Sequence, residues 1–222
     1  AALLTPPSRQ VAQAEESGAA VTGKVPWNGP VPPVATMDVT KDNEKCECSA
    51  KDASKRSTKK IMEHVVVDSA SKGVANCVIW LKGVKGGPSL TTEVDQKGCE
   101  FTPHVALVTV GAKVKVLNPD KIAHNYHWWS KLNNAENVSI PKFKPSVEVP
   151  ADGFQKAEFM RVTCDVHPWM FGWIAVMENG YAALSDATGA FSIAGVPPGK
   201  YTLALWHEPA TDDGKPFMME KE

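Results

Sequence analysis

The chain has 222 residues, 43% of them hydrophobic, and a formal net charge of −1. These values are typical of a globular protein with enough chain to bury a core, and the nearly neutral charge argues against a nucleic-acid binder. No apolar run approaches the roughly 20 residues of a transmembrane helix, so we expect no transmembrane segment. The five cysteines are an odd number, so at least one stays outside any set of intrachain disulfides.

Residues 1–19 lack clear periodicity and are expected to form a flexible tail. Beyond them, short apolar runs alternate with turns containing Gly, Pro, Asn or Asp, a pattern typical of β-sandwiches and barrels. Val114 and Val116 alternate with lysines, which predicts a strand with both valines on its buried face. Residues 129–146 have little strand pattern and are expected to form a long loop. Because no segment beyond the tail has convincing helical periodicity, the predicted fold class is all-β.

The strongest chemical signal is a loop in which Cys164, His167 and Met170 follow one another with two residues between each. A type 1, or blue, copper site consists of two imidazoles and one thiolate in a plane, with a weak thioether ligand on the axis. This loop offers three of those ligands, and His124 is the candidate for the second imidazole. Methionine is a poor ligand for zinc, so we favour copper over a zinc site. The alternative is an inert buried thiol at Cys164, with Met170 as ordinary core.

These residues resemble the copper loop of the cupredoxins, with amicyanins and plastocyanins the nearest in style. The segment 124–127, His-Asn-Tyr-His, is similar to the first-histidine segment of amicyanins, and residues 101–118 are similar to the strands that precede it. The resemblance extends over roughly residues 98–178. It implies a cupredoxin Greek-key β-sandwich with one type 1 copper as its cofactor.

Specific residue roles are implied by this resemblance. Asn125 would connect the two ligand loops, and Asn118 or Asn125 would donate a hydrogen bond toward the Cys164 sulfur. His127 matches the family pattern but is not a ligand in it. The copper ligands implied are His124, Cys164, His167 and Met170.

A second resemblance involves the segments 186–191 and 197–201, which read Asp-Ala-Thr-Gly-Ala-Phe and Pro-Pro-Gly-Lys-Tyr. They are similar to hairpin and strand motifs of the carboxypeptidase-regulatory-like, transthyretin-like β-sandwich family. This implies a second, smaller sandwich into which the copper domain is inserted, the alternative being one enlarged cupredoxin with decorated edges. The expected domains are a tail at 1–19, a discontinuous sandwich at 20–97 plus 179–222, and a copper domain at 98–178.

If Cys164 is reserved for copper, four cysteines remain: Cys46, Cys48, Cys77 and Cys99. They can pair in three ways, and the sequence does not choose between them. A resemblance to bacterial secreted cupredoxin-like proteins implies a Cys46–Cys99 bridge, with Cys48 and Cys77 as the other pair. Two disulfides would place the mature chain, its signal peptide removed, in the periplasm or outside the cell.

The function implied is transport of single electrons by Cu(I)/Cu(II) cycling, between a donor and an acceptor of the cytochrome or dehydrogenase type. The partner would dock at the exposed edge of His167, surrounded by Pro168 and Trp169. Two alternatives remain open: a copper chaperone or store, and a scaffold module in which copper is secondary.

An enzyme is not expected, because a copper oxidase or reductase needs a second copper site. Such a site could arise only between several chains, since no histidine cluster is left in the sequence. His64 and His104 are expected to be structural, and His207 to form a hydrogen bond at a domain edge.

Overall fold

The computed structural model describes residues 18–33, 35–42, 45–46, 59–62, 64–209 and 215–222. These residues form strands and turns without any α-helix, which confirms the predicted all-β class. No helix among them is therefore long and apolar enough to cross a membrane. The expected tail falls almost wholly on residues 1–17, which lie outside the described part of the chain.

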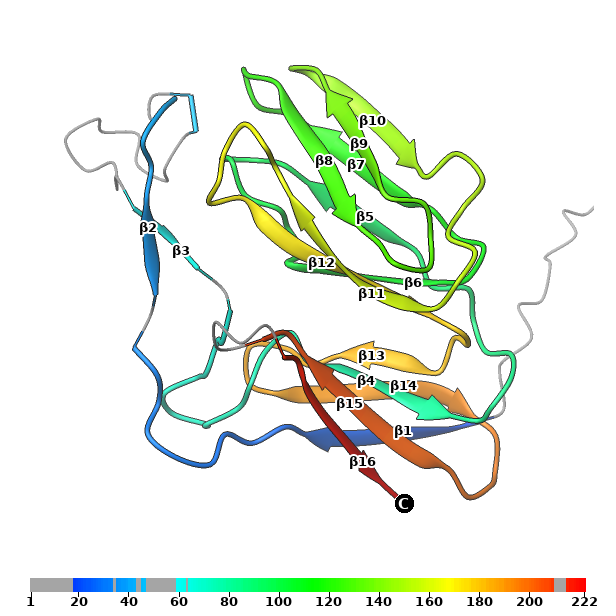
Figure 1. Cartoon of the computed structure of the whole chain (residues 1–222). Coiled ribbons are helices and arrows are strands. Elements are labelled where there is room, and N and C mark those ends of the chain that lie inside the picture. The colour runs from blue at the N-terminus through cyan, green and yellow to red at the C-terminus, as the bar shows by residue number, and fades with distance from the viewer. Residues whose placement is uncertain (1–17, 34, 43–44, 47–58, 63, 210–214) are drawn as a thin grey trace, which may run out of the picture.

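Four sheets are stacked in layers, and the two upper sheets of Figure 1 enclose one core. One sheet has the strand order β10-β7-β5 and the other the order β6-β12-β11-β8-β9. These strands are β5 (Thr92–Asp95), β6 (Val105–Thr109), β7 (Val114–Asn118), β8 (His124–Trp129), β9 (Glu136–Ile140), β10 (Lys144–Val149), β11 (Glu158–Thr163) and β12 (Phe171–Met177).

The upper sandwich agrees with the sequence in its alternation but not in its extent. Val114 and Val116 are fully buried, as predicted. The region 129–146, predicted to be a loop, contains β9 and the start of β10, because their backbone groups pair with β8 and β7. Likewise β5, which precedes the expected domain boundary at residue 98, pairs with β7 and so belongs to this sandwich.

The two lower sheets come from both ends of the chain and have the orders β13-β4-β15-β16 and β1-β14. Apolar side chains of β4 and β15 pack directly against β6 and β12 of the upper sandwich, with Trp206 stacked on Phe159 at 4.5 Å. The layers therefore share a buried apolar interface. The lower strands are β1 (Ala19–Lys24), β4 (Val78–Lys82), β13 (Ala182–Leu184), β14 (Ala190–Val196), β15 (Thr202–His207) and β16 (Phe217–Lys221).

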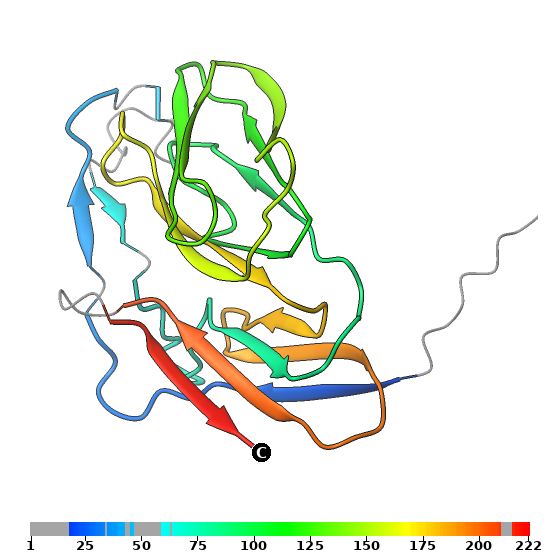
Figure 2. The same cartoon turned by 45° about the vertical axis from the view of Figure 1, so that its right-hand side comes forward.

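A two-stranded arm, β2 (Thr36–Asp38) and β3 (Lys59–Ile61), leaves the lower sandwich and runs up beside the upper one. Figure 2, turned by 45°, shows the arm again alongside the end of the upper sandwich that carries the yellow loop before β12. A disulfide between Cys46 and Cys99 connects the arm to that end. The arm therefore reaches the loop that the sequence marks as a metal site.

Candidate metal centre

The sheet brings the distant donor residues together. His124 begins β8, and Cys164 directly follows β11, which is the neighbour of β8 in the sheet. Antiparallel pairing of these two strands places the start of one beside the end of the other. His167 and Met170 then lie in the short loop between β11 and β12.

Three of the four predicted ligands converge in a buried cluster. The Nδ1 atoms of His124 and His167 are 3.0 Å apart, and the Cys164 sulfur is 3.7 Å from Nδ1 of His167. One donor atom from each of the three residues lies within 4.8 Å of the others, and all three residues are at most 2% exposed. Donors about 2.0 to 2.3 Å from one metal ion are themselves about 3 to 4 Å apart, so this spacing suits a single ion.

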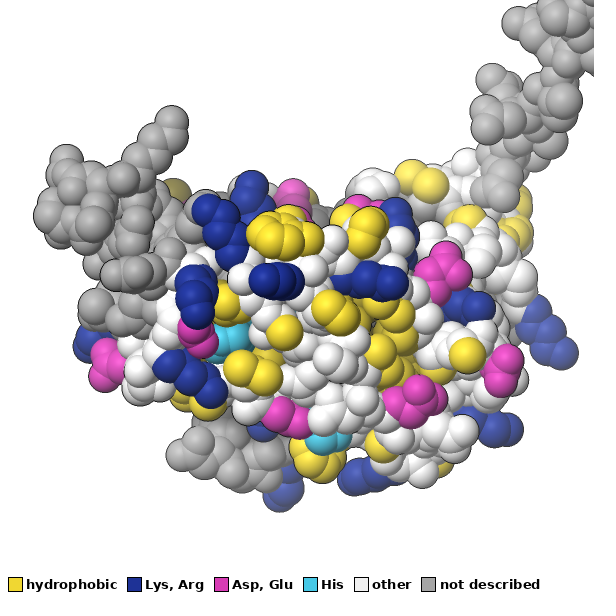
Figure 3. All heavy atoms as spheres, turned by 90° about the horizontal axis from the view of Figure 1, so that it is seen from above, with side chains coloured by type: hydrophobic (Ala, Val, Ile, Leu, Met, Phe, Trp, Pro, Cys, Tyr) yellow, Lys and Arg dark blue, Asp and Glu magenta, His cyan; other side chains and the backbone are white. Residues whose placement is uncertain are grey.

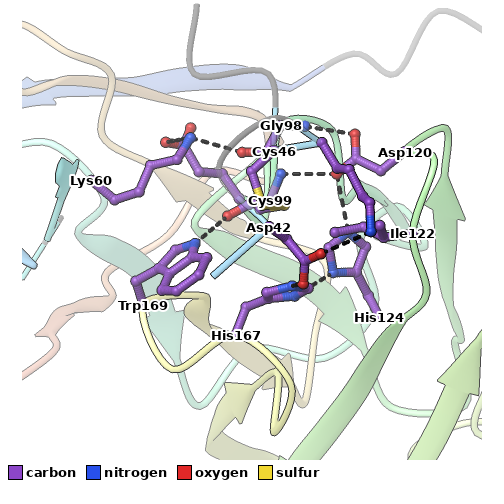
Figure 4. The surroundings of a disulfide bond; sticks show 12 residues. Asp42, Cys46, Lys60, Gly98, Cys99, Asp120, Ile122, His124, His167 and Trp169 are labelled. Carbon is purple, nitrogen blue, oxygen red and sulfur yellow. Dashed lines mark hydrogen bonds and ion pairs between the residues drawn. A yellow bond between two sulfur atoms is a disulfide. The ribbon is translucent and has the colours of Figure 1, made fainter. Parts of the chain in front are cut away.

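Two carboxylates hold the imidazoles in this orientation. Nε2 of His124 lies 3.0 Å from Asp120, and Nε2 of His167 lies 3.4 Å from Asp42 (Figure 4). When Nε2 carries the proton and donates to a carboxylate, the lone pair is left on Nδ1, the atom that faces the cluster. In that tautomer, both rings point the lone pair of Nδ1 toward the cluster.

The Cys164 thiol is poised to ionise. Burial opposes ionisation, but hydrogen bonds with His124, His167 and the backbone outweigh it and lower the pKa of Cys164 to about 6. The same neighbours act on His124: burial lowers its pKa, but Asp120 and Cys164 raise it overall. A thiolate is therefore available near neutral pH, and the thiolate is the form that binds metals.

Asn125 connects the two ligand segments, as the cupredoxin resemblance implied. Its Oδ1 atom accepts the backbone N–H of Asp165 at 2.8 Å and lies 3.3 Å from the Cys164 sulfur. The implied donation toward the sulfur is not seen for the side chain of either asparagine. Asn125 turns its acceptor oxygen to the sulfur, and Nδ2 of Asn118 donates to the carbonyls of Ile122 and Ile140. Asn118 therefore supports the turn before His124.

Met170 is 1% exposed and belongs to the core of the upper sandwich, together with Cys164 and Trp169. The loop that carries it is closed by two backbone hydrogen bonds: Cys164 donates to the Met170 carbonyl at 3.0 Å, and Met170 donates to the His167 carbonyl at 2.9 Å. These bonds hold the ligand loop in a compact turn, with Met170 on its buried side.

The expected exposed edge of His167 is absent. His167 is 0% exposed and Trp169 is 4% exposed, because the arm covers this end of the sandwich with Asp42 and the Cys46–Cys99 disulfide. Asp165, Val166 and Pro168 are the exposed residues of the loop. The sequence could not predict this cover, since Asp42 lies far from the loop along the chain.

The cysteines follow the implied pairing in part. Cys46 and Cys99 are bridged, whereas Cys77 is a free thiol that is buried in the lower sandwich. Burial raises the pKa of Cys77 to about 11, so it is an inert group. The expected Cys48–Cys77 pair is therefore not formed, and Cys48 itself lies outside the described residues.

A second histidine cluster does exist, contrary to expectation. Buried Glu208 contacts His64 at 3.2 Å, forms a short contact with His104, and accepts the Trp173 indole N–H at 2.9 Å. Nδ1 of His207 donates to the backbone carbonyl of Glu208 at 2.9 Å. These residues come from elements far apart in the sequence, and no spacing signal could have joined them.

His127 keeps clear of the donor cluster, as its expected non-ligand role requires. Its Nδ1 atom lies 3.0 Å from the Asp165 carboxylate, and its ring packs on Trp129 at 4.1 Å. Sequence reasoning missed Asp120 and Asp42 as partners of the imidazoles. Asp120 had a usable signal, because it lies four residues before His124 in a polar turn.

No protein-family profile and no curated protein matches the chain. Solved structures that are similar over part of it include a copper-containing nitrite reductase from Thermus scotoductus, with 24% identity and a TM-score of 0.34, matching 43% of this chain and 24% of the reductase. A purple cupredoxin from Nitrosopumilus maritimus has 18% identity and a TM-score of 0.32, over 38% of this chain and 98% of its own. Amicyanin from Paracoccus versutus has 16% identity and a TM-score of 0.33, over 44% of this chain and 96% of amicyanin.

Proposed function

We propose that this chain is a type 1 copper protein that carries single electrons between redox partners. One observation carries the proposal: two inward-facing Nδ1 atoms and an ionisable thiol meet in a buried cluster, with their outer nitrogens held by carboxylates. Two imidazoles and one thiolate are the donor set of a blue-copper site. His124, Cys164 and His167 would hold the ion, and Met170 would be its thioether ligand.

Copper, when bound, supplies a one-electron couple between Cu(I) and Cu(II). The protein's part is to keep the donors in place while the charge at the site changes. Asn125 fixes the loop to β8, and the two backbone bonds between residues 164 and 170 keep the loop closed. Because these contacts do not involve the donor atoms that face inward, the same arrangement can serve both oxidation states.

We further propose a location and a partner surface. The Cys46–Cys99 disulfide favours an oxidising compartment such as the periplasm or the cell exterior. The face seen in Figure 3 exposes apolar side chains among basic and acidic ones. A donor or acceptor of the cytochrome or dehydrogenase type would approach the ligand loop at exposed Val166 and Pro168 instead of His167.

The lower sandwich is proposed to be a carboxypeptidase-regulatory-like, transthyretin-like domain. The segments 186–191 and 197–201 support this, since they form the turns that flank β14 and precede β15. Such a sandwich acts as a scaffold in many settings, so it adds no activity to the proposal.

The test is a visible and EPR spectrum of the copper-loaded full chain, with cyclic voltammetry. We expect an intense thiolate-to-copper band and a reversible one-electron couple, both abolished in Cys164→Ser. Cys77→Ser is the matched control, because it removes the other described free thiol from a different sandwich. A colourless copper form would reject electron transport. Rapid loss of copper to a weak chelator would instead support copper handling.

A further inference from the structure

His167 lies between two sulfur-containing groups. On one side is the Cys164 sulfur, 3.7 Å from Nδ1. On the other is the disulfide: the sulfurs of Cys46 and Cys99 and a ring nitrogen of His167 all lie within 4.8 Å of one another. All four residues are at most 2% exposed. The same imidazole therefore belongs to two donor clusters, and Figure 4 shows it beside the disulfide.

Cys99 also lies close to His124, the other imidazole of the centre. The Cys99 sulfur, an Asp120 oxygen and a His124 nitrogen lie within 4.8 Å of one another. Asp120 accepts the backbone N–H of Cys99 at 2.9 Å. The carboxylate that contacts His124 is therefore hydrogen-bonded to the segment that carries the disulfide. The disulfide thus lies directly beside the metal centre.

Polar contacts hold the arm in addition to the disulfide. Lys60 donates to the Gly98 carbonyl at 2.7 Å and pairs with Glu100 at 2.8 Å, and Asp42 reaches His167. Among the described residues, the disulfide is the sole covalent link between arm and upper sandwich. Its reduction would leave the arm attached by these noncovalent contacts.

We propose that Cys46 and Cys99, once reduced, form with His167 a second metal site for a thiophilic ion, Zn(II) or Cu(I), beside the His124–Cys164–His167 centre. The disulfide takes up two electrons and two protons from a dithiol reductant, which becomes a disulfide itself. The two new thiols lose their protons when they bind the ion. This goes beyond electron transport, because the site uses neither Cys164 nor a copper couple.

The donor chemistry supports this assignment. Sulfurs in a disulfide are poor ligands, whereas thiolates are strong ligands for soft and borderline ions. Two thiolates, each about 2.3 Å from one ion, lie about 3.8 Å apart in a tetrahedral site. Reduction breaks the S–S bond and so allows the two sulfurs to separate to this distance. The protein then binds the ion at this site when Cys46 and Cys99 are reduced, and does not bind it when they form the disulfide.

The test uses the full chain with Cys48→Ser, Cys77→Ser and Cys164→Ser, so that Cys46 and Cys99 are its sole cysteines. Anaerobically reduced protein is titrated with Co(II), a spectroscopic substitute for zinc, and Zn(II) is then added. We expect a thiolate-to-cobalt band that Zn(II) removes. The band should be lost in the oxidised protein and when Cys46→Ser and Cys99→Ser are added. It should weaken with His167→Gln.

Folding of each variant is checked by circular dichroism. A folded, reduced protein without a thiolate–cobalt band overturns the proposal, as does equal binding before and after reduction. If the multiple variant does not fold, reduced Cys164→Ser is alkylated with and without Zn(II), and mass spectrometry reads each cysteine. Protection of Cys46 and Cys99 supports the site, and equal labelling rejects it. Because Cys164 is absent throughout, the outcome is independent of the proposed electron carrier.

Discussion

Nε2 of His124 lies 3.0 Å from Oδ2 of Asp120, and both side chains are buried. Asp120 also accepts the backbone N–H groups of Gly98 and Cys99, each at 2.9 Å. Burial disfavours the charged carboxylate, yet these donors together lower the pKa of Asp120 below its ordinary value. The Asp120 carboxylate, which orients His124, is thus kept ionised by the same segment that carries the disulfide.

Replacing Asp120 with Asn should weaken copper binding about 10- to 100-fold, as is typical for a residue that orients a metal ligand. The new amide N–H₂ would face the backbone N–H donors, or would turn and face His124. Competition with a chromophoric chelator measures the affinity. Asp152→Asn is the control, since Asp152 is exposed in a turn. Equal affinities in the two variants would show that Asp120 does not position the ligand.

The metal-free protein should hold Cys164 as a thiolate down to about pH 6. Because the pKa is lowered from 9.0, the thiolate is present above pH 6 and is lost as the pH falls through that value. The thiolate absorbance of the wild type minus that of Cys164→Ser reports the titration. Cys77→Ser should leave the curve unchanged, since the pKa of Cys77 is raised to about 11. A midpoint near 9 would mean that the imidazoles do not stabilise the thiolate.

Asn125→Ala should destabilise the metal-free protein by about 1–3 kcal/mol, because it leaves the buried hydrogen-bonding groups around Cys164 without their partner. The lost contacts are those to the Asp165 N–H, the Cys164 sulfur and Asn137. Urea unfolding measures the change, and the EPR spectrum of the copper form should broaden as the loop loosens. Asn134→Ala, at an exposed position in the β8–β9 turn, is the control and should be nearly neutral. Similar losses in both variants would contradict a special role for Asn125.

Glu208→Leu should cost about 3–5 kcal/mol of unfolding free energy, because it removes the shared partner of three buried or half-buried donors. Those donors are the rings of His64, His104 and Trp173. Burial opposes ionisation, but these partners outweigh it and lower the pKa of Glu208, so its contribution should be lost as the pH falls through the folded-state value. Urea unfolding at several pH values tests both statements. Glu178→Gln is the control, because Glu178 is exposed. A loss independent of pH would contradict the ionic part.

Local patterns in the sequence were sufficient to predict the class of the fold, and they named His124, Cys164 and His167, which the structure brings together. Alternation of Val114 and Val116 with lysines predicts a buried strand face, because side chains of a strand point to opposite sides. The spacing of Cys164, His167 and Met170 predicts that they share one loop, because they are close together along the chain, and backbone hydrogen bonds close that loop into a compact turn. These properties depend on neighbours along the chain, and such neighbours are visible in a sequence.

Only the tertiary structure decided what surrounds the donors. Pairing of β9 with β8 turned an expected loop into a strand, since backbone hydrogen bonds across a sheet override a weak local pattern. The arm brought Asp42 and Cys46 against His167, and packing of the sandwiches joined Glu208 to two distant histidines. The sequence by itself determined which atoms can bind a metal. Long-range packing determined which of them are covered, because burial depends on segments far apart in the chain.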